Sequence, residues 1–170
     1  MDDKARARFG EFAQSRTAAL IRAAYLLTGD QHAAEDLVQS ALAKTYVKWP
    51  TIRHEDPEGY VRAVMYRERV SWWRRRGRLR ETLVGSPVER EHPDDSGHAD
   101  LRLAMRAALL RLPVAQRAVL VLRYYEDLPE RQVAEVLGCS VGTVRSRTHR
   151  AVSRLREVLP GAELVLELKR

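Results

Sequence analysis

The stretch from Val133 to Arg150, VAEVLGCSVGTVRSRTHR, has the pattern of two short helices joined at a glycine. Ala134 is small enough to let two helices cross closely, and Gly138, four residues later, permits the positive φ angle of a tight turn. Ser140 can cap the next helix. Val144 follows Ala134 by ten residues, which places an apolar side chain between the two helices. This spacing predicts a helix-turn-helix.

The second helix of this motif carries a polar face that is suited to DNA. Residues at positions i, i+1, i+4 and i+5 lie together on one face, and an arginine there can donate two hydrogen bonds to a guanine in the major groove. Serine and histidine can reach a neighbouring base edge. The residues predicted to contact duplex DNA are Thr143, Arg145, Ser146, Arg147, His149 and Arg150. The alternative interpretation is an amphipathic helical hairpin whose basic face is only hydrated.

Helical periodicity covers most of the remaining chain, and no strand pattern competes with it. Ahead of the motif, the apolar residues predict one helix that Pro113 closes and another from Val114 to Tyr125. The N-terminal part is expected to form about three helices. Their ends are predicted from cap residues and prolines at Gly29, Asp30, Pro50 and Asp56-Pro57.

A change of composition divides the chain. Residues 79–99 combine prolines and glycines with acidic side chains and few large apolar residues, which is typical of a flexible acidic linker. The sequence therefore predicts an all-α fold with two small helical domains, residues 1–78 and 100–160. The linker joins them, and a short tail, residues 161–170, follows the second.

The third helix of the N-terminal domain interleaves arginines with aromatic side chains. Guanidinium groups attract phosphates, and flat rings offer surfaces on which unpaired bases stack. The residues predicted to contact nucleic acid here are Tyr60, Arg62, Tyr66, Arg67, Trp72, Trp73, Arg74, Arg75 and Arg76. The competing interpretation places Tyr60 and one of the two tryptophans in the core and leaves the arginines as a hydrated face.

The composition fits a protein that binds a polyanion. The net charge is +7 over 170 residues, and no stretch approaches the ~20 apolar residues that a membrane span requires. The single cysteine, Cys139, excludes an internal disulfide and is typical of a reducing cytoplasm. We expect Cys139 to be a small packed residue in the hinge turn, with redox sensing as the alternative.

The sequence does not predict an enzyme. It contains no phosphate-cradling glycine loop and no plausible nucleophile triad, and its five histidines are scattered. No cofactor is expected. His92, Asp94, Asp95 and His98 could look like metal ligands, but in an acidic segment without a scaffold they are expected to be hydrated, and no metal site is predicted.

Two long parts of the chain resemble one protein family. The segment LPVAQRAVLVLRYYEDLPERQVAEVLGCSVGTVRSRTHRAVSRLREVL is similar to region 4 of bacterial RNA polymerase sigma factors of the extracytoplasmic-function group. LLTGDQHAAEDLVQSALAKTYVKW, followed by PEGYVRAVMYRERVSWWRRRGR, resembles their region 2. The SWWRR ending is most like the actinobacterial SigE-type subfamily, and the resemblance covers nearly the whole chain in the family's order.

The resemblance implies a cytoplasmic sigma factor that binds core RNA polymerase and directs promoter-specific transcription initiation. In this family, region 2 binds the polymerase clamp and melts and reads the −10 element, whereas region 4 reads the −35 element. The predicted duplex contacts then become −35 contacts, and the predicted contacts from Tyr60 to Arg76 become −10 contacts. The resemblance assigns clamp binding to Glu35, Asp36 and Gln39, and capture of a flipped base to Pro50–Tyr60.

The resemblance also implies promoter DNA and core polymerase as partners, allows for an anti-sigma factor, and favours a chain that is monomeric when free. Four positions depart from the family's pattern. Pro129 replaces the usual serine or threonine cap, and Thr148 replaces a leucine or isoleucine. Ser40 stands where glutamate is common, and Arg67 stands where many members have asparagine near the flipped base. The alternative function is a stand-alone helix-turn-helix regulator, which would bind duplex DNA tightly without polymerase and dimerise on a palindrome.

Overall fold

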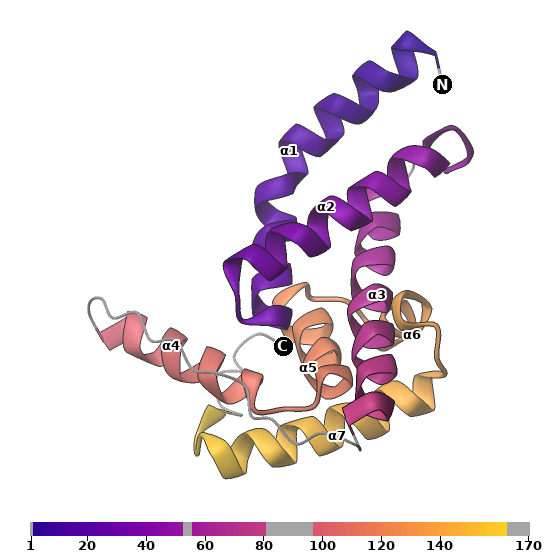
Figure 1. Ribbon diagram of the computed structural model, residues 1–170. Coiled ribbons are helices and arrows are strands. Elements are labelled where there is room, and N and C mark those ends of the chain that lie inside the picture. The colour runs from indigo at the N-terminus through magenta and orange to yellow at the C-terminus, as the bar shows by residue number, and fades with distance from the viewer. Residues whose placement is uncertain (1, 53–55, 81–96, 163–170) are drawn as a thin grey trace.

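The computed structural model describes residues 2–52, 56–80 and 97–162, without the side chains of residues 72–80 and 97–100. Every regular element in these ranges is helical (Figure 1), which confirms the all-α prediction. None of the described helices is long and apolar enough to cross a membrane. In chain order the elements are α1 (Asp3–Thr28), α2 (Gln31–Lys48), the 3-10 turn η1 (Trp49–Thr51), α3 (Pro57–Arg80), α4 (Gly97–Leu110), α5 (Val114–Leu120), the π-helical turn η2 (Val121–Tyr125), α6 (Glu130–Leu137) and α7 (Val141–Val158).

Both ends of the predicted linker belong to helices. Helix α3 continues to Arg80 and α4 begins at Gly97, so each enters the range 79–99 that the composition assigns to the linker. Residues 81–96 and 163–170 lie outside the described residues. The same holds for His92, Asp94 and Asp95, and for the side chain of His98.

The end of α1, the start of α2 and the start of α3 lie at the predicted caps. Gly29 ends α1 with a φ of 77°, and its N–H donates to the Tyr25 carbonyl at 2.8 Å. The Asp30 carboxylate accepts from an N–H in the first turn of α2 at 2.9 Å, and Asp56 caps α3 in the same way at 2.7 Å. Each cap satisfies a backbone group that a helix end leaves without an intrahelical partner.

An aromatic cluster joins the far ends of α1 and α2. Trp49 begins η1 directly after α2 and is only 3% exposed. Its ring centroid lies 5.1 Å from that of Phe9 and 5.3 Å from that of Phe12, both on α1. Pro50, next in the chain, has no N–H to donate to a continuing helix. The predicted stop of α2 at Trp49-Pro50 is therefore confirmed, and the same tryptophan fastens α2 to α1.

The second half differs from the prediction where a single helix is expected from Val114 to Tyr125. The structure ends α5 at Leu120 and continues as η2, in which the Glu126 N–H donates to the Val121 carbonyl at 3.0 Å. This i to i+5 hydrogen bond makes the turn wider than an α-helical turn. Apolar spacing does not reveal such a turn, because the buried residues Val121 and Leu122 are compatible with either helix type.

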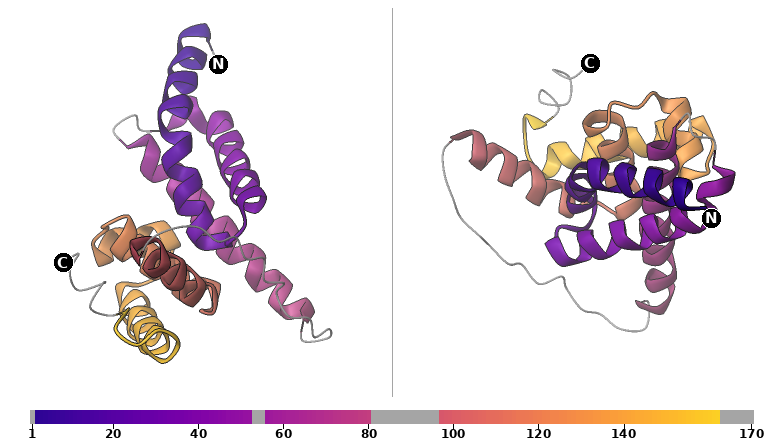
Figure 2. Two further views of the ribbon diagram at one scale, coloured as in Figure 1. Left: turned by 90° about the vertical axis from the view of Figure 1, so that its left-hand side faces the viewer. Right: turned by 90° about the horizontal axis from the view of Figure 1, so that it is seen from above.

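The two helical halves pack against each other around a common core. Helix α3 runs past α5 and α6 (Figure 1), and the two further views keep α3 beside that group (Figure 2). The sequence predicts two domains on a tether, but it does not predict that they share a core. The core includes Leu20, Leu27, Val61, Met65 and Tyr66 from α1 and α3, together with Val119, Val121, Leu122, Val133 and Val144 from the second half.

Arg117 of α5 joins the halves through a buried guanidinium group. The residue is 6% exposed, and it donates hydrogen bonds to the carbonyls of Leu27, Leu110 and Leu112, the last two at 3.1 Å. Burial lowers the pKa of Arg117 to about 10, and the nearby charge of Arg69 acts in the same direction. Arg117 thus remains a cation at neutral pH, and carbonyl dipoles from α1 and from the end of α4 surround its charge.

Replacement of Arg117 by alanine is expected to lower the free energy of unfolding by about 2 kcal/mol. Three buried carbonyls lose their hydrogen-bond donor, and the loss is partly offset because a charge no longer has to be buried. Urea unfolding followed by circular dichroism measures this change. Arg111→Ala, which removes an exposed arginine one residue after α4, is the matched control. We expect the control to change stability by less than about 0.5 kcal/mol. Equal effects of the two substitutions would contradict the role of Arg117.

Candidate nucleic-acid interface

Helices α6 and α7 form the predicted helix-turn-helix. Gly138 ends α6 with a φ of 62°, and the Ser140 hydroxyl accepts from the Thr143 N–H at 3.1 Å where α7 begins. Val144 is completely buried in the common core, and Ala134 is 6% exposed. The turn glycine, the cap and the wedge residue therefore occupy the places that their spacing predicts.

The predicted duplex contacts all lie on α7, in two environments. The exposed ones are Arg145, His149 and Arg150, and the half-buried ones are Thr143, Ser146 and Arg147. The Ser146 hydroxyl donates to the Thr143 carbonyl at 3.1 Å, and the Thr143 hydroxyl lies 2.9 Å from that of Ser140. Buried residues on the opposite side of α7, such as Ala151 and Leu155, hold the helix against the protein. Three basic side chains are consequently exposed on the outer face of α7.

Glu130, at the start of α6, holds the first of these basic side chains. Arg145 Nε lies 2.8 Å from a Glu130 carboxylate oxygen, and the two side chains are 69% and 31% exposed. An ion pair this exposed adds little stability. It does restrict the guanidinium through Nε, while the two terminal nitrogens can still donate to a base edge. Nothing in the sequence pattern singles out Glu130 for this role.

The nine residues of α3 predicted to contact nucleic acid are unevenly exposed. Tyr60 is 36% exposed, so the competing interpretation that placed Tyr60 in the core is wrong. Arg62 is half-buried, Tyr66 is 0% exposed, and Arg67 is exposed. The side chains of Trp72, Trp73, Arg74, Arg75 and Arg76 lie outside the described residues.

A surface hollow of about 310 Å³ opens where η1 approaches the start of α3. Lys48, Thr51, Ile52, Asp56 and Tyr60 line it. Residues 53–55 of the same segment lie outside the described residues. Tyr60 offers an aromatic ring, and Lys48 and Asp56 offer a donor and an acceptor, which are the groups that stack a flipped base and hydrogen-bond its edges.

Helix α2 carries the predicted clamp contacts. Asp36 and Gln39 are exposed, whereas Glu35 is half-buried and accepts from Gln31 at 2.6 Å. Ser40, which departs from the family's pattern, donates to Glu68 of α3 at 3.0 Å. The hydroxyl at this position therefore helps to hold α2 against α3.

A carboxylate that the sequence analysis missed faces α3 from the other half. The Arg62 guanidinium lies 3.0 Å from oxygens of both Glu58 and Glu126, and the Arg62 and Glu126 side chains are 15% and 13% exposed. Burial raises the pKa of Glu126, against the opposing effect of Arg62. Burial also raises the pKa of Tyr66 well above its ordinary value, and the charge of Glu126 adds to that shift. Glu126 follows η2 in a polar stretch without periodicity, so no sequence signal marks it.

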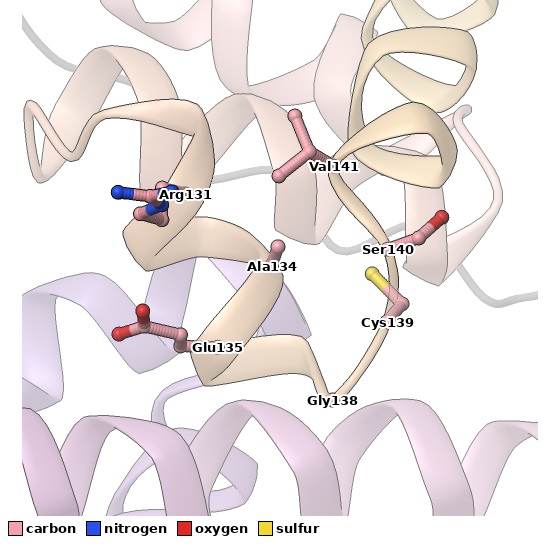
Figure 3. A pocket seen from close by; sticks show the side chains of 7 residues that line it. All are labelled: Arg131, Ala134, Glu135, Gly138, Cys139, Ser140 and Val141. Atoms are coloured by element: carbon pink, nitrogen blue, oxygen red, sulfur yellow. The ribbon is translucent and has the colours of Figure 1, made fainter.

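Cys139 lies in the turn between α6 and α7, is half-buried and packs against the common core. Figure 3 shows its sulfur directed from the turn toward Ala134 of α6. The described side chains contain no group of three or more histidines, cysteines or acids that could hold a metal ion. The open hollow beside the turn measures about 630 Å³ and is lined by Arg131, Ala134, Glu135, Gly138, Cys139, Ser140 and Val141.

The raised pKa of Glu126 gives the protein a pH dependence with a definite sign. The folded chain holds a proton on Glu126 more tightly than the unfolded chain does. The contribution of this group is complete below the unfolded value of ~4.3 and is lost as the pH rises above it. We therefore expect the stability of the wild type relative to Glu126→Gln to fall as the pH rises above about 4.

Urea unfolding at a series of pH values measures this difference. Glu11→Gln, which removes an exposed carboxylate of α1, is the reference for the loss of one charge. A wild type that becomes more stable relative to Glu126→Gln as the pH rises would contradict the prediction.

Comparison with known proteins agrees with this geometry. Residues 13–79 match the family described as Sigma-70 region 2, and residues 102–155 match the family described as Sigma-70, region 4. The RNA polymerase sigma-E factor of Streptomyces coelicolor is 41% identical over 162 residues, which cover 92% of this chain and 88% of that protein. The ECF RNA polymerase sigma factor SigL of Mycobacterium tuberculosis is 36% identical over 150 residues, which cover 84% of this chain and 83% of that one.

Solved structures show the same similarity over both halves of the chain. The sigma factor RpoE, in its co-crystal with the anti-sigma factor NepR from Bartonella quintana, matches with a TM-score of 0.74 and 29% identity, covering 91% of this chain and 98% of that one. CnrH, in complex with the cytosolic domain of CnrY, matches with a TM-score of 0.62 at 21% identity over 91% and 88% of the two chains, and so shows a common fold. With both regions matched in order and a relative 41% identical over most of its length, the chain belongs to the extracytoplasmic-function family of RNA polymerase sigma factors.

Proposed function

We propose that this chain binds core RNA polymerase and directs transcription initiation at promoters that carry a −35 and a −10 element. The observation that carries the proposal is the presence, in one chain of this family, of a helix-turn-helix with an exposed basic face and of a second helix that begins beside a hollow lined by an aromatic ring. Helix α7 exposes Arg145, His149 and Arg150 from a helix-turn-helix, and α3 begins beside the hollow that Tyr60 lines. The chain then acts as an initiation factor in the cytoplasm, and catalysis belongs to the polymerase.

The proposed division of the chain assigns region 2 to residues 1–78, the linker to 79–99, region 4 to 100–160 and the tail to 161–170. The family matches at 13–79 and 102–155 support these bounds to within a few residues at the linker. The two promoter elements lie roughly 50 to 70 Å apart, at ~34 Å per helical turn. The 16 residues between the end of α3 and the start of α4 reach up to ~55 Å when extended, so two regions on such a tether can engage both elements once the widths of the regions are added.

Region 4 is proposed to read the −35 element through the first turns of α7. Arg145, held by Glu130, and Arg150 supply guanidinium donors for guanine edges or phosphates, and His149 lies between them on the exposed face. Thr143, Ser146 and Arg147 are half-buried, and they are proposed to contact the sugar-phosphate backbone or to hold the exposed side chains in place.

Region 2 is proposed to read the −10 element through α3 and the hollow at its start. Tyr60, Lys48 and Asp56 surround the space in which a flipped base is proposed to lie. The remaining proposed contacts to the melted strand are Arg62, Tyr66, Arg67, Trp72, Trp73, Arg74, Arg75 and Arg76. Arg62 and Tyr66 are covered in the free chain, and their use therefore requires a rearrangement.

Helix α2 is proposed to bind the polymerase clamp. Asp36 and Gln39 are exposed on it, and Glu35 lies beside them. A second protein partner is proposed from the similarity to RpoE, whose co-crystal contains the anti-sigma factor NepR. An anti-sigma factor that covered α2 would prevent this chain from reaching the polymerase.

Transcription with core polymerase on a library of randomised promoters tests the function. Transcript starts that require this chain and share elements near −35 and −10 are the expected result. Arg145→Ala is expected to reduce initiation about tenfold or more at promoters that carry the preferred −35 base, because one bidentate contact is worth ~1–3 kcal/mol. Arg111→Ala, an exposed arginine outside α7, is the control and should leave initiation unchanged.

Duplex binding without polymerase distinguishes the alternative function. Tight and sequence-specific binding of the chain alone, together with no chain-dependent starts, would assign it to the stand-alone helix-turn-helix regulators and contradict the proposal. Weak binding alone that becomes tight and specific with core polymerase is the expected outcome.

Glu130 is expected to influence promoter choice more than stability. Glu130→Gln removes the carboxylate that restrains Arg145, so the preference for the base that Arg145 reads should weaken by a few-fold, since each good bidentate pair contributes ~1–3 kcal/mol of discrimination. The promoter-library experiment measures this preference position by position. Glu135→Gln, an exposed glutamate of the same helix, is the matched control. An unaltered base preference in Glu130→Gln would contradict the positioning role.

A further inference from the structure

A second core lies apart from the common core, between α4, α5 and the end of α7. Its buried residues are Ala108, Leu109, Leu112, Leu120, Ala151, Leu155 and Ala162. Met105 of α4 packs against them. Figure 1 shows α4 beside the yellow end of α7, with the first turns of α4 projecting beyond the other helices. The start of α4 therefore extends past the helices that enclose the second core.

Leu101 continues the apolar face of the second core toward the start of α4. It precedes Met105 by one helical turn and Ala108 by two, so the three side chains share one face of the helix. Ala108 is 2% exposed and Met105 is half-buried, whereas Leu101 is 46% exposed. Exposure thus rises along a single apolar face. The described residues leave the far end of this face, at Leu101, open to solvent.

Leu103 is exposed to a similar extent, 37%, but it lies on another face of α4. Two residues apart, the leucines point about 200° away from each other around the helix. Leu103 shares its side of α4 with Arg106, three positions later. The Arg106 guanidinium carbon lies 4.5 Å from the centroid of the Tyr25 ring on α1. The face of Leu103 therefore turns toward α1, and only Leu101 extends the second core.

The described part of the chain ends inside the same core. Ala162, the second residue of the proposed tail, is 2% exposed, and its N–H donates to the Leu159 carbonyl at 3.1 Å. Residues 163–170, ELVLELKR, lie outside the described residues. Four of these eight residues are large and aliphatic: Leu164, Val165, Leu166 and Leu168. Burial of such side chains is favourable, so a segment that starts from a buried residue is expected to add to the core beside it.

We propose that residues 163–170 dock as a helix along α4 and cover the second core at Leu101. The lengths agree. Eight helical residues span about 12 Å, and the stretch of α4 from Ala108 back to Leu101 spans about 10.5 Å. The segment starts beside Ala108, because Ala162 belongs to the same core. A helix that continues from Ala162 along α4 therefore ends near Leu101.

The side chains of the segment suit this surface. As a helix, residues 163–170 place three of their four aliphatic side chains on one face, with both glutamates along one edge of it. Arg102 is exposed next to Leu101 on α4 and offers these carboxylates a cation. Docking also ties α4 to α7, since Leu155 of α7 belongs to the second core. The tail thereby holds the first helix of region 4 to its last, whichever DNA the region reads.

Hydrogen exchange of the free chain, followed by mass spectrometry, measures how firmly α4 is held. Leu101→Ser is expected to speed exchange of the α4 amides about tenfold, because the contact of a leucine with the tail is lost. Leu103→Ser removes the same side chain from the other face of the same helix and is the matched control. We expect the control to change exchange by less than about twofold. Equal effects of the two substitutions would overturn the proposal.

A chain that ends at Ala162 tests the tail itself. Its α4 amides should exchange faster by a factor similar to that of Leu101→Ser. The two changes together should have little more effect than either alone, since each removes one side of the same contact. Removal of only Lys169 and Arg170, which follow the aliphatic side chains, is the control for shortening the chain. Additive effects, or unchanged exchange of α4 in the chain that ends at Ala162, would overturn the proposal.

Circular dichroism shows whether Leu101→Ser still folds. If it does not, the comparison of the two shortened chains decides alone. The same exchange measurement distinguishes other occupants of the face at Leu101. Protection of α4 that increases with chain concentration would assign the face to a second copy, and protection that appears only with core polymerase would assign it to the polymerase. Either result would overturn docking of the tail, whereas protection in the dilute free chain that requires residues 163–168 is the expected outcome.

Discussion

Gly138 imposes the constraint on which the second half of the molecule depends. Its left-handed conformation ends α6 after eight residues and turns the chain so that Ser140 can cap α7. Val144 then reaches the core, and the polar face of α7 is left outside. The same turn leaves the last carbonyls of α6 open toward α3, where Arg67 occupies them. One backbone conformation thus determines both the placement of α7 and the contact between the two halves.

The arginines of this basic chain differ in function because they differ in what neutralises them. Arg117 is enclosed by carbonyls and holds α5 to the first half. Arg62 and Arg67 meet Glu126 and a helix terminus at a contact between the halves, and Arg145 lies in solvent beside a single carboxylate. A guanidinium keeps its charge in all these settings, so its surroundings decide which other groups it can reach.

Local features of the fold were predictable from the sequence because short-range interactions produce them. The caps at Gly29, Asp30 and Asp56 depend on residues within one helical turn, and so does the start of α7 at Ser140. The polar face of α7 follows from helical periodicity in the same way. The π-helical turn after α5 was not predictable, because its wider hydrogen-bond spacing leaves the apolar pattern compatible with an ordinary helix.

The sequence by itself therefore determined the all-α class, most helix ends, the helix-turn-helix and the exposure of Arg145, His149 and Arg150 on α7, although it also counted the half-buried Arg147 among the outward side chains. The tertiary structure alone decided that the two halves share a core, that Tyr66 is buried within it, and that Glu126 meets Arg62 across 64 positions of sequence. The physical reason is the sequence separation over which each interaction acts. Caps and periodic faces are set by neighbours within a few residues, whereas burial and ion pairing depend on which surfaces meet after the chain has folded back on itself.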